Sequence, residues 1–306
     1  MLDAHKLRIF AAVSELKSFS LAARKLFLTQ PTVSQHISAL EEHIGLPLLD
    51  RNGKNVSLTR AGELLYRYAK QISEISEEAQ QALDFFKGRK SGHIALGAST
   101  IPGEYILPGL MGTFCSQYPG IKTTLRIADT EDIVRQLLDR EIEFGIIGAR
   151  VSGSRLQFTD FMEDELVVVV PRGHRWWDAG RVDLSDLTAE PFVMRESGSG
   201  TRISLGKRLQ ELGLHPGTLT VAAEVGSTTA VKEAVRAGLG ISIVSAMAVR
   251  DEERHKQLKV VRIGAARILR TFYFVQDRRR ALSPLAEAFI AFLQQQSLTA
   301  GLNDPA

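Results

Sequence analysis

The apolar positions between residues 18 and 51 recur at helical spacing. Four of them follow at intervals of four, three and four residues and form one stripe: Val33, Ile37, Leu40 and Ile44. Thr29 is a suitable N-cap for this helix, and Pro31 is tolerated in a first turn, where amides have no intrahelical partner. Ala22, Ala23 and Leu26 give a preceding helix a small packing face. The pattern predicts two helices joined by a tight turn.

The opposite face of the second helix carries short polar side chains. A helix that is apolar behind and short-polar in front suits insertion into the major groove of DNA. The residues expected to contact DNA from this helix are Gln30, Pro31, Thr32, Ser34, Gln35 and Ser38. Gln35 is the candidate for reading a base edge, with adenine as its bidentate partner. Thr32 and Ser34 are candidates for contact with either base or phosphate.

A hairpin is predicted directly after these helices. Asn52-Gly53 lies between two short extended runs, which is a strong signal for a two-residue turn. Arg51 and Lys54 flank this tip, where they are placed to meet phosphate and so to contribute affinity and register. The alternative is that both are ordinary solvated cations; beside the predicted helix pair we favour the contact with DNA.

One long amphipathic helix is predicted over residues 59–88, with Thr59 as its N-cap. Its apolar positions alternate in steps of four and three, at Ala61, Leu65, Tyr68, Ile72, Ile75, Ala79, Ala82 and Phe86. A helix lying on a globular body usually has a wider apolar stripe, so this narrow seam favours pairing between two chains. Such a dimer would present two recognition helices to half-sites related by a dyad.

Extended and helical patterns alternate from residue 93 to residue 297. The extended runs are 93–98, 121–128, 144–148, 166–170, 192–195, 219–225, 241–245, 258–263 and 270–276, and the helical runs are 104–118, 132–143, 205–212, 228–237 and 284–295. This alternation predicts an α/β fold with a parallel sheet and crossover helices. Two similar rounds of the pattern suggest two halves that enclose a cleft.

Hydroxyl-rich segments follow three of the predicted strands. Open α/β sheets bind ligands at the carboxyl ends of their strands, and free amides at helix N-termini suit an anion. The residues expected to bind an effector are Ser99, Thr100, Ser197, Ser199, Thr201, Arg202, Ser227 and Thr228. Arg202 could add a bidentate donor to a carboxylate or oxyanion. Each cluster taken singly reads more easily as a helix cap; three at equivalent places favour a site for a small anionic metabolite or oxyanion.

The N-terminal motifs resemble those of LysR-type transcriptional regulators. The matching residues are Ala22-Ala23, Thr29-Gln30-Pro31, Val33-Ser34, Ile37, Leu40-Glu41, Gly45, Pro47-Leu48, Arg51 and Leu58-Thr59-x-Ala61-Gly62. Length, element order and linker agree over nearly the whole chain. The resemblance implies a winged helix-turn-helix, a linker helix and a two-subdomain α/β effector domain like that of periplasmic binding proteins. It also implies effector contacts by Ser99, Thr100 and Thr201, a homodimer or homotetramer, and RNA polymerase as a candidate partner.

These observations give a division into three parts. Residues 1–58 are expected to form the DNA-binding domain, 59–88 a dimerisation linker helix and 89–306 the effector-binding domain. Within the last part, subdomain I is expected at about 92–162 and 268–297, and subdomain II at about 163–267.

Composition changes this interpretation little. A net charge of +3 is too small to indicate nucleic acid by itself, and Cys115, the single cysteine, favours a reducing compartment. No signal-peptide pattern and no apolar run of roughly 20 residues is visible, so we expect a cytoplasmic protein without membrane contact. No metal-ligand spacing, cofactor fingerprint or nucleophile–base pair is visible, which argues against an enzyme. A plain solute-binding module remains the alternative, but it leaves residues 1–88 unexplained.

Overall fold

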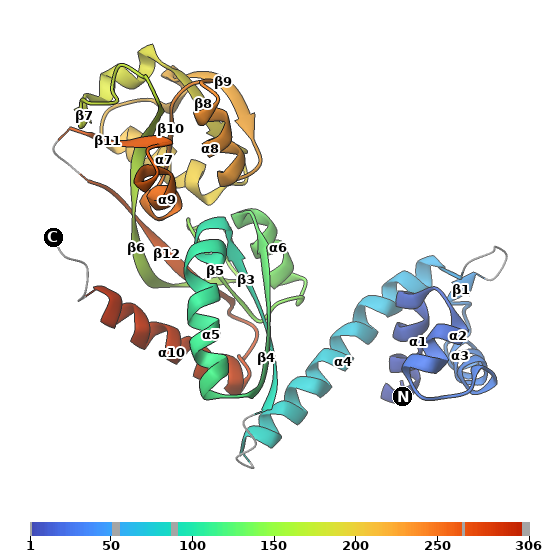
Figure 1. Cartoon of the computed structure of the whole chain (residues 1–306). Helices are drawn as coiled ribbons and strands as arrows, with labels where there is room; N and C mark the ends of the chain where they lie inside the picture. The colour runs from blue at the N-terminus through green and yellow to red at the C-terminus, as the bar shows by residue number, and fades with distance from the viewer. Residues whose placement is uncertain (1, 51–55, 87–90, 265–266, 302–306) are drawn as a thin grey trace. The chain divides into compact units, whose positions relative to one another are not determined.

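The computed structural model of the chain describes residues 2–50, 56–86, 91–264 and 267–301 (Figure 1). The chain divides into two compact units, Met1–Lys87 and Gly88–Ala306. The predicted hairpin tip, with Arg51 and Lys54, lies outside the described residues.

Three helices build the N-terminal unit: α1 (Ala4–Leu16), α2 (Phe19–Lys25) and α3 (Gln30–Ile44). The predicted helix pair is confirmed, since α3 begins at the Thr29 cap, whose hydroxyl accepts the Thr32 amide at 3.4 Å. Val33 and Ile37 are fully buried against α1 and α2, as their spacing requires. The helix ends at Gly45, whose left-handed backbone (φ 76°) is a conformation that glycine adopts without a steric penalty.

A short antiparallel ribbon and a long helix complete this unit. Strands β1 (Leu49–Asp50) and β2 (Ser57–Leu58) pair, and α4 spans Arg60–Phe86. The Glu41 carboxylate accepts the amides of Leu48 and Leu49, which fixes the ribbon to the end of α3. Thr59 caps α4 by accepting the Gly62 amide at 3.0 Å.

The apolar seam of α4 has two parts. Ala61 and Leu65 pack into the core of the N-terminal unit, while Tyr68, Ile72 and Ile75 are 57%, 38% and 50% exposed. The first turns of the predicted seam therefore belong to the domain core, whereas Tyr68, Ile72 and Ile75 are exposed to solvent.

The second unit contains an eight-stranded sheet and a two-stranded one. The strands are β3 (Ser91–Ser99), β4 (Gly120–Ala128), β5 (Phe144–Ile147), β6 (Leu156–Pro171), β7 (Arg181–Val182), β8 (Pro191–Arg195), β9 (Thr220–Val225), β10 (Ser242–Ser245), β11 (Leu258–Ile263) and β12 (Ile268–Asp277). The larger sheet has the order β4-β3-β5-β12-β6-β11-β7, with β10 also paired to β6, and β8 pairs with β9.

The sheet is mixed, whereas the sequence pattern predicted a parallel one. Strand β3 is parallel to β4 and β5, and β8 is parallel to β9, but β6 pairs antiparallel with β10, β11 and β12. The difference arises at β6, which is 16 residues long and was recognised only over its apolar end at 166–170. Its first part pairs with β12 and its last part with β10 and β11, so β6 runs through both halves of the unit (Figure 1).

Helices lie on both faces of the larger sheet. They are η1 (Pro102–Ile106), α5 (Leu107–Gln117), α6 (Thr130–Leu138), η2 (Leu184–Ala189), α7 (Gly200–Glu211), η3 (Pro216–Thr218), α8 (Thr228–Arg236), η4 (Ala246–Val249), α9 (Arg250–Arg254) and α10 (Pro284–Gly301). The predicted helices are all present, and α9, η2, η3 and η4 were not predicted.

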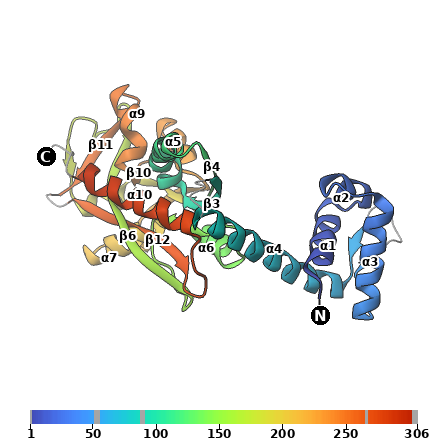
Figure 2. The ribbon, with the colours of Figure 1, turned by 90° about the horizontal axis from the view of Figure 1, so that it is seen from below.

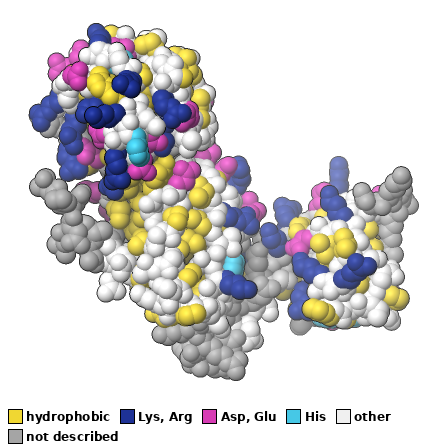
Figure 3. Space-filling model, in the orientation of Figure 1, with side chains coloured by type: hydrophobic (Ala, Val, Ile, Leu, Met, Phe, Trp, Pro, Cys, Tyr) yellow, Lys and Arg dark blue, Asp and Glu magenta, His cyan; other side chains and the backbone are white. Residues whose placement is uncertain are grey.

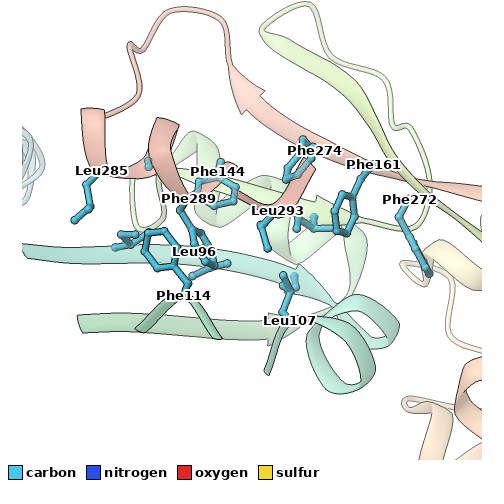
Figure 4. Close-up of a cluster of buried hydrophobic side chains, with 14 of the residues drawn as sticks. Leu96, Leu107, Phe114, Phe144, Phe161, Phe272, Phe274, Leu285, Phe289 and Leu293 are labelled. Atoms are coloured by element: carbon cyan, nitrogen blue, oxygen red, sulfur yellow. The ribbon is translucent and has the colours of Figure 1, made fainter. Parts of the chain in front are cut away.

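Two lobes result, each with its own core. Lobe I contains β3–β5, η1, α5, α6 and α10, and lobe II contains β7–β11 and α7–α9; β6 and β12 connect them (Figures 1 and 2). In lobe I, α5 and α10 lie on one face of the sheet, where the Phe114 and Phe289 rings are 4.6 Å apart (Figure 4), and α6 packs with Ile133 and Leu137 on the other. In lobe II, Leu205 of α7 and Val231 of α8 belong to separate clusters.

Candidate functional site

The polar face of α3 forms the candidate DNA-binding surface. Gln30, Pro31, Gln35 and Ser38 are exposed, and Thr32 and Ser34 are half-buried. The Thr32 hydroxyl lies 2.8 Å from that of Thr29, so it is oriented by the cap of its own helix. The six residues predicted on α3 thus share one accessible surface above a buried stripe, which is the arrangement that groove insertion requires.

A pocket lies between the two lobes of the second unit. Three segments meet there: the end of β3 with Ser99 and Thr100, the start of α6 with Asp129 and Thr130, and the start of α7 with Ser199, Gly200 and Thr201. Ile101, Arg195 and Arg270 complete its lining. The pocket has a volume of about 10 Å³, which is room for one water-sized group. Polar groups from distant parts of the chain therefore face a common small space.

Arg270 forms the floor of this pocket through a buried network. Its Nε donates to Asp164 at 2.8 Å, and its Nη1 donates to the Thr201 hydroxyl at 2.9 Å. Asp164 also accepts the Ser245 hydroxyl at 2.6 Å. Burial lowers the pKa of Arg270 and the Arg195 charge acts in the same direction, while Asp164 opposes both. Because Asp164 and Arg270 are cross-strand partners on β6 and β12, the network lies on the two strands that connect the lobes.

Arg195 is the second buried cation of the pocket. It is 5% exposed and stands at the end of β8. Its guanidinium donates to both carboxylate oxygens of Glu196, at 2.7 and 2.5 Å, and to the Thr228 hydroxyl at 2.8 Å. Burial raises the pKa of Glu196, but the hydrogen bonds and charge of Arg195 outweigh it and hold that pKa below its ordinary value. Glu196 is therefore ionised at neutral pH.

Helix starts add positive potential to the pocket. The helices α6 and α7 begin at Thr130 and Gly200, and the free amides of a first turn favour negative charge. The two starts are closely packed, because a Cβ on Gly200 would lie 2.4 Å from the Thr130 hydroxyl oxygen. Only glycine permits this approach of lobe II to lobe I.

The structure brings together four of the eight predicted effector residues. Ser99, Thr100, Ser199 and Thr201 line the pocket. Thr228 lies behind it as the acceptor for Arg195, whereas Ser227 caps α8 through the Ala230 amide and does not line the pocket. Ser197 is exposed and does not line it either.

Arg202 does not have the position that the sequence suggested. Its Nη1 donates to the Arg195 carbonyl at 2.7 Å and to the Glu224 carboxylate at 2.6 Å. The side chain lines a separate hollow of about 550 Å³ together with Met194 and Lys207. Arg202 therefore does not line the pocket, and the cations that line it are Arg195 and Arg270.

Sequence reasoning missed four polar residues of the pocket: Asp129, Thr130, Arg195 and Arg270. A signal existed for three of them. Asp129-Thr130 follows the strand at 121–128 as a cap pair, like the clusters that were recognised. Arg195 is a cation at the end of an otherwise apolar run, where burial with a partner is expected. No local pattern marks Arg270 as a pocket residue. Its position depends on Asp164, which lies 106 residues earlier in the sequence on the partner strand.

Within the described residues, no group of three or more His, Cys, Asp or Glu side chains is placed to hold a metal ion. In the same part of the chain, no helix has the length and apolarity needed to cross a bilayer.

Comparison with known proteins identifies the class to which this fold and site belong. Residues 4–63 match the family described as "Bacterial regulatory helix-turn-helix protein, lysR family", and residues 87–297 match the "LysR substrate binding domain". The chain belongs to the LysR family of transcriptional regulators. It joins a helix-turn-helix DNA-binding domain to an effector-binding domain and is a regulator, not an enzyme.

Two relatives match the chain over nearly its whole length. The transcriptional activator CmpR of Synechocystis is 34% identical over 289 residues, 94% of each chain. The RuBisCO operon transcriptional regulator of Allochromatium vinosum is 33% identical over 293 residues, 95% of each chain. Among solved structures, the CcmR regulatory domain of Synechocystis, in complex with 2-PG, superposes with a TM-score of 0.63 at 28% identity and covers 71% of this chain and 100% of that one.

Proposed function

We propose that this regulator responds to a small anionic effector bound in the pocket between lobes I and II. The observation that carries the proposal is the meeting of two buried arginines, a row of hydroxyls and two helix starts in one space, from segments as far apart as Ser99 and Arg270. A structural role alone would not require so many donors around one small cavity. The complex of the related CcmR domain with 2-PG supports a small ligand in this domain.

DNA recognition is proposed for the exposed face of α3. Gln35 would read a base edge, while Gln30, Thr32, Ser34 and Ser38 would contact base or phosphate. Arg51 and Lys54, which lie outside the described residues, are proposed to contact phosphate. With residues 1–58 as the DNA-binding domain, 59–88 as the linker and 89–306 as the effector domain, the protein would work in the cytoplasm with the DNA that it reads.

A homodimer or homotetramer is proposed because apolar side chains are left uncovered. On α4 these are Leu64, Tyr68, Ile72, Ile75 and Leu83, each 38–57% exposed. On lobe I, Tyr105 and Ile127 are exposed and Leu110 and Met111 are half-buried, and Figure 3 shows hydrophobic side chains on the surface around α5. Pairing through α4 would give two copies of α3 a dyad-symmetric DNA site. RNA polymerase remains a candidate partner in this scheme.

Regulation would follow from a change in the separation of the lobes. A ligand that contacts both lobes favours the closed state, and only its differential affinity can shift the equilibrium. The shift would change how subunits pack and hence how the two copies of α3 meet DNA. A solute-binding module without regulation does not account for the N-terminal unit.

Replacing Gln35 tests the DNA-reading role. Gln35→Ala is expected to lose roughly 5- to 150-fold discrimination between selected and random DNA, about 1–3 kcal/mol for one bidentate base contact. The measurement is a pair of equilibrium titrations at one fixed salt concentration, since phosphate contacts dominate at low salt. Gln117→Ala, at an exposed position of α5, is the matched control. Unchanged discrimination in Gln35→Ala would remove this residue from its role.

Thermal melts of the full chain against metabolite anions test the effector role. A ligand at about 100 times its dissociation constant adds roughly 2.7 kcal/mol of stability. We expect a selective hit that is lost in Thr201→Ala and that also changes affinity for DNA. A hit that survives Thr201→Ala unchanged would place the effector elsewhere.

A further inference from the structure

A second hollow lies on lobe II, apart from the pocket between the lobes. Helix α7, the turn η3 and the start of β9 surround it. Its volume is about 550 Å³, against about 10 Å³ for the pocket, and small-molecule sites usually measure roughly 300–1,000 Å³. The hollow therefore has room for a ligand much larger than one water-sized group.

The buried lining of this hollow is aliphatic. Met194, Leu205, Leu209 and Leu219 line it and are buried, and Val221 lines it with 50% of its surface exposed. Among the residues that the structure describes, no aromatic ring lines the hollow, so no stacking partner is offered to a planar ligand. Removal of apolar surface from water would stabilise an aliphatic chain in this space.

Gly206 leaves this space open. It lies in the interior of α7, where glycine is less favourable than alanine. Its backbone does not require glycine, because it does not have a positive φ. Packing does not require glycine either, since a Cβ would meet only Pro216, at 3.8 Å. The missing side chain leaves part of the hollow unfilled.

The charges at the hollow suit one anionic group. Arg202 and Lys207 line it, and no carboxylate among the described residues does. Arg202 Nη1 donates to the Arg195 carbonyl and to Glu224, but its Nε and Nη2 donate to no described residue. The Lys207 ammonium lies 3.9 Å from Glu211, which is too far for a hydrogen bond. Because Glu224 offsets one of the two cations, about one positive charge is left for a ligand.

The hollow and the pocket share a wall. Met194 lines the hollow and Arg195 the pocket, and on α7 Thr201 lines the pocket and Arg202 the hollow. Arg202 also holds the Arg195 carbonyl at 2.7 Å. A ligand that draws the Arg202 guanidinium toward itself therefore acts directly on the segment that positions Arg195.

We propose that this hollow is a second ligand site, which binds an aliphatic monoanion with its carboxylate at Arg202 and Lys207 and its chain along the buried leucines. Occupation of the site changes the affinity of the regulator for DNA. The binding site is independent of the proposed function of the pocket, whereas this regulatory effect rests on it.

Calorimetric titration of the full chain with octanoate tests the binding site. Octan-1-ol, which has the chain without the charge, and acetate, which has the charge without the chain, are the comparison ligands. We expect saturable binding of one octanoate per chain and affinities at least roughly tenfold weaker for both comparison ligands, because each satisfies only one half of the site.

Two pairs of variants locate the binding. Gly206→Met places a flexible apolar side chain in the hollow and should abolish octanoate binding, whereas Gly206→Ala leaves most of the space and should retain it. Arg202→Met should weaken binding roughly tenfold or more, since a charge-assisted contact is lost. Its control is Arg208→Met on the same helix, because both arginines pair with a glutamate and their side chains are 36% and 39% exposed. Urea denaturation of each variant shows whether it is folded.

Titration with selected DNA at one fixed salt concentration tests the regulatory effect. Octanoate should change the affinity of the wild type and of Gly206→Ala for DNA by roughly fivefold or more, and should not change that of Gly206→Met.

Each contrary result has a separate meaning. Absence of octanoate binding, or equal binding by folded Gly206→Met and Gly206→Ala, would overturn the second site. Equal affinities for octanoate and octan-1-ol would overturn its anionic ligand class. Binding that is lost in Thr201→Ala but kept in Gly206→Met would assign octanoate to the pocket between the lobes. Octanoate bound in the hollow with no change in DNA affinity would overturn the regulatory effect alone and would not affect the proposed function of the pocket.

Discussion

The two units of this chain present their functional groups in opposite ways. On α3, Gln35 and Ser38 are exposed, and only an apolar core beneath them fixes the helix. In the second unit, Arg195 and Arg270 are 5% and 6% exposed and are held by carboxylates: Arg195 by the adjacent Glu196, and Arg270 by Asp164 on another strand. The DNA-reading residues can therefore change without cost to folding, whereas the effector residues are also structural.

Removal of Arg270 should have the largest effect on stability. Arg270→Met leaves the Asp164 side chain, which is 0% exposed, as an uncompensated buried charge. We expect a loss of about 3–5 kcal/mol in the free energy of unfolding, measured by urea denaturation. Replacing both partners by apolar residues should recover much of this loss. Arg267→Met, in an ion pair with Glu165 at a 60% exposed position, should cost less than about 1 kcal/mol. Equal losses of stability in Arg270→Met and Arg267→Met would contradict the view that the buried pocket residues are also structural.

Gly200→Ala should show how far the effector response depends on the close approach of the two lobes. The new Cβ would lie 2.4 Å from the Thr130 hydroxyl oxygen, so either the Thr130 side chain turns away or the lobes move apart. We expect a loss of about 1–3 kcal/mol, as for other overpacked positions, and loss of the effector response in thermal melts. Gly206→Ala lies on the same helix, where its Cβ would meet only Pro216 at 3.8 Å; it should gain about 0.5–1 kcal/mol. A full effector response in Gly200→Ala would show that this contact does not control closure.

The same contrast explains what the sequence could predict. The spacing of Val33 and Ile37 and the cap at Thr29 are local signals, so the helix pair and its exposed face followed directly. Ser99 and Thr201 were also found, because each follows a strand within a short segment. Arg270 was not, since its role depends on Asp164, 106 residues earlier, and no local pattern encodes that pairing.

Strand direction was missed for a related reason. The alternation of strands and helices predicts parallel neighbours, and β3, β4 and β5 obey it. The first ten residues of β6 mix polar and apolar positions and hide the fact that the strand continues from one lobe to the other. The antiparallel pairing of β6 with β12 follows from this long crossing, which is a property of the whole fold.

In the N-terminal unit, Phe27 is an exposed residue that is expected to lower the stability of the fold. It is 96% exposed in the turn between α2 and α3 and has a left-handed backbone (φ 56°), which is costly for a bulky side chain. We expect Phe27→Asn to raise the free energy of unfolding by about 1 kcal/mol, measured by urea denaturation. Leu46→Asn, 52% exposed and without a positive φ, should change it by less than about 0.5 kcal/mol. A loss of stability in Phe27→Asn would mean that the ring has a partner, such as a second chain.

The smallest expected effect is a change in stability with pH. It tests whether an ion pair of the second unit that does not line the pocket also stabilises the fold. Burial raises the pKa of Asp277, but the hydrogen bond and charge of Arg155 outweigh it and lower that pKa from the ordinary 3.8. A depressed carboxyl pKa contributes stability that is present above the unfolded value and is lost as the pH falls through the folded value. Asp277→Asn should therefore be less stable than wild type at pH 7, and the difference should shrink as the pH falls below 3.8. Asp160→Asn, whose carboxylate is 71% exposed in its ion pair with Arg150, is the control and should show little difference at either pH. If Asp277→Asn matched wild type at pH 7, this pair would not contribute to folding, and the contrast would narrow to the pocket itself.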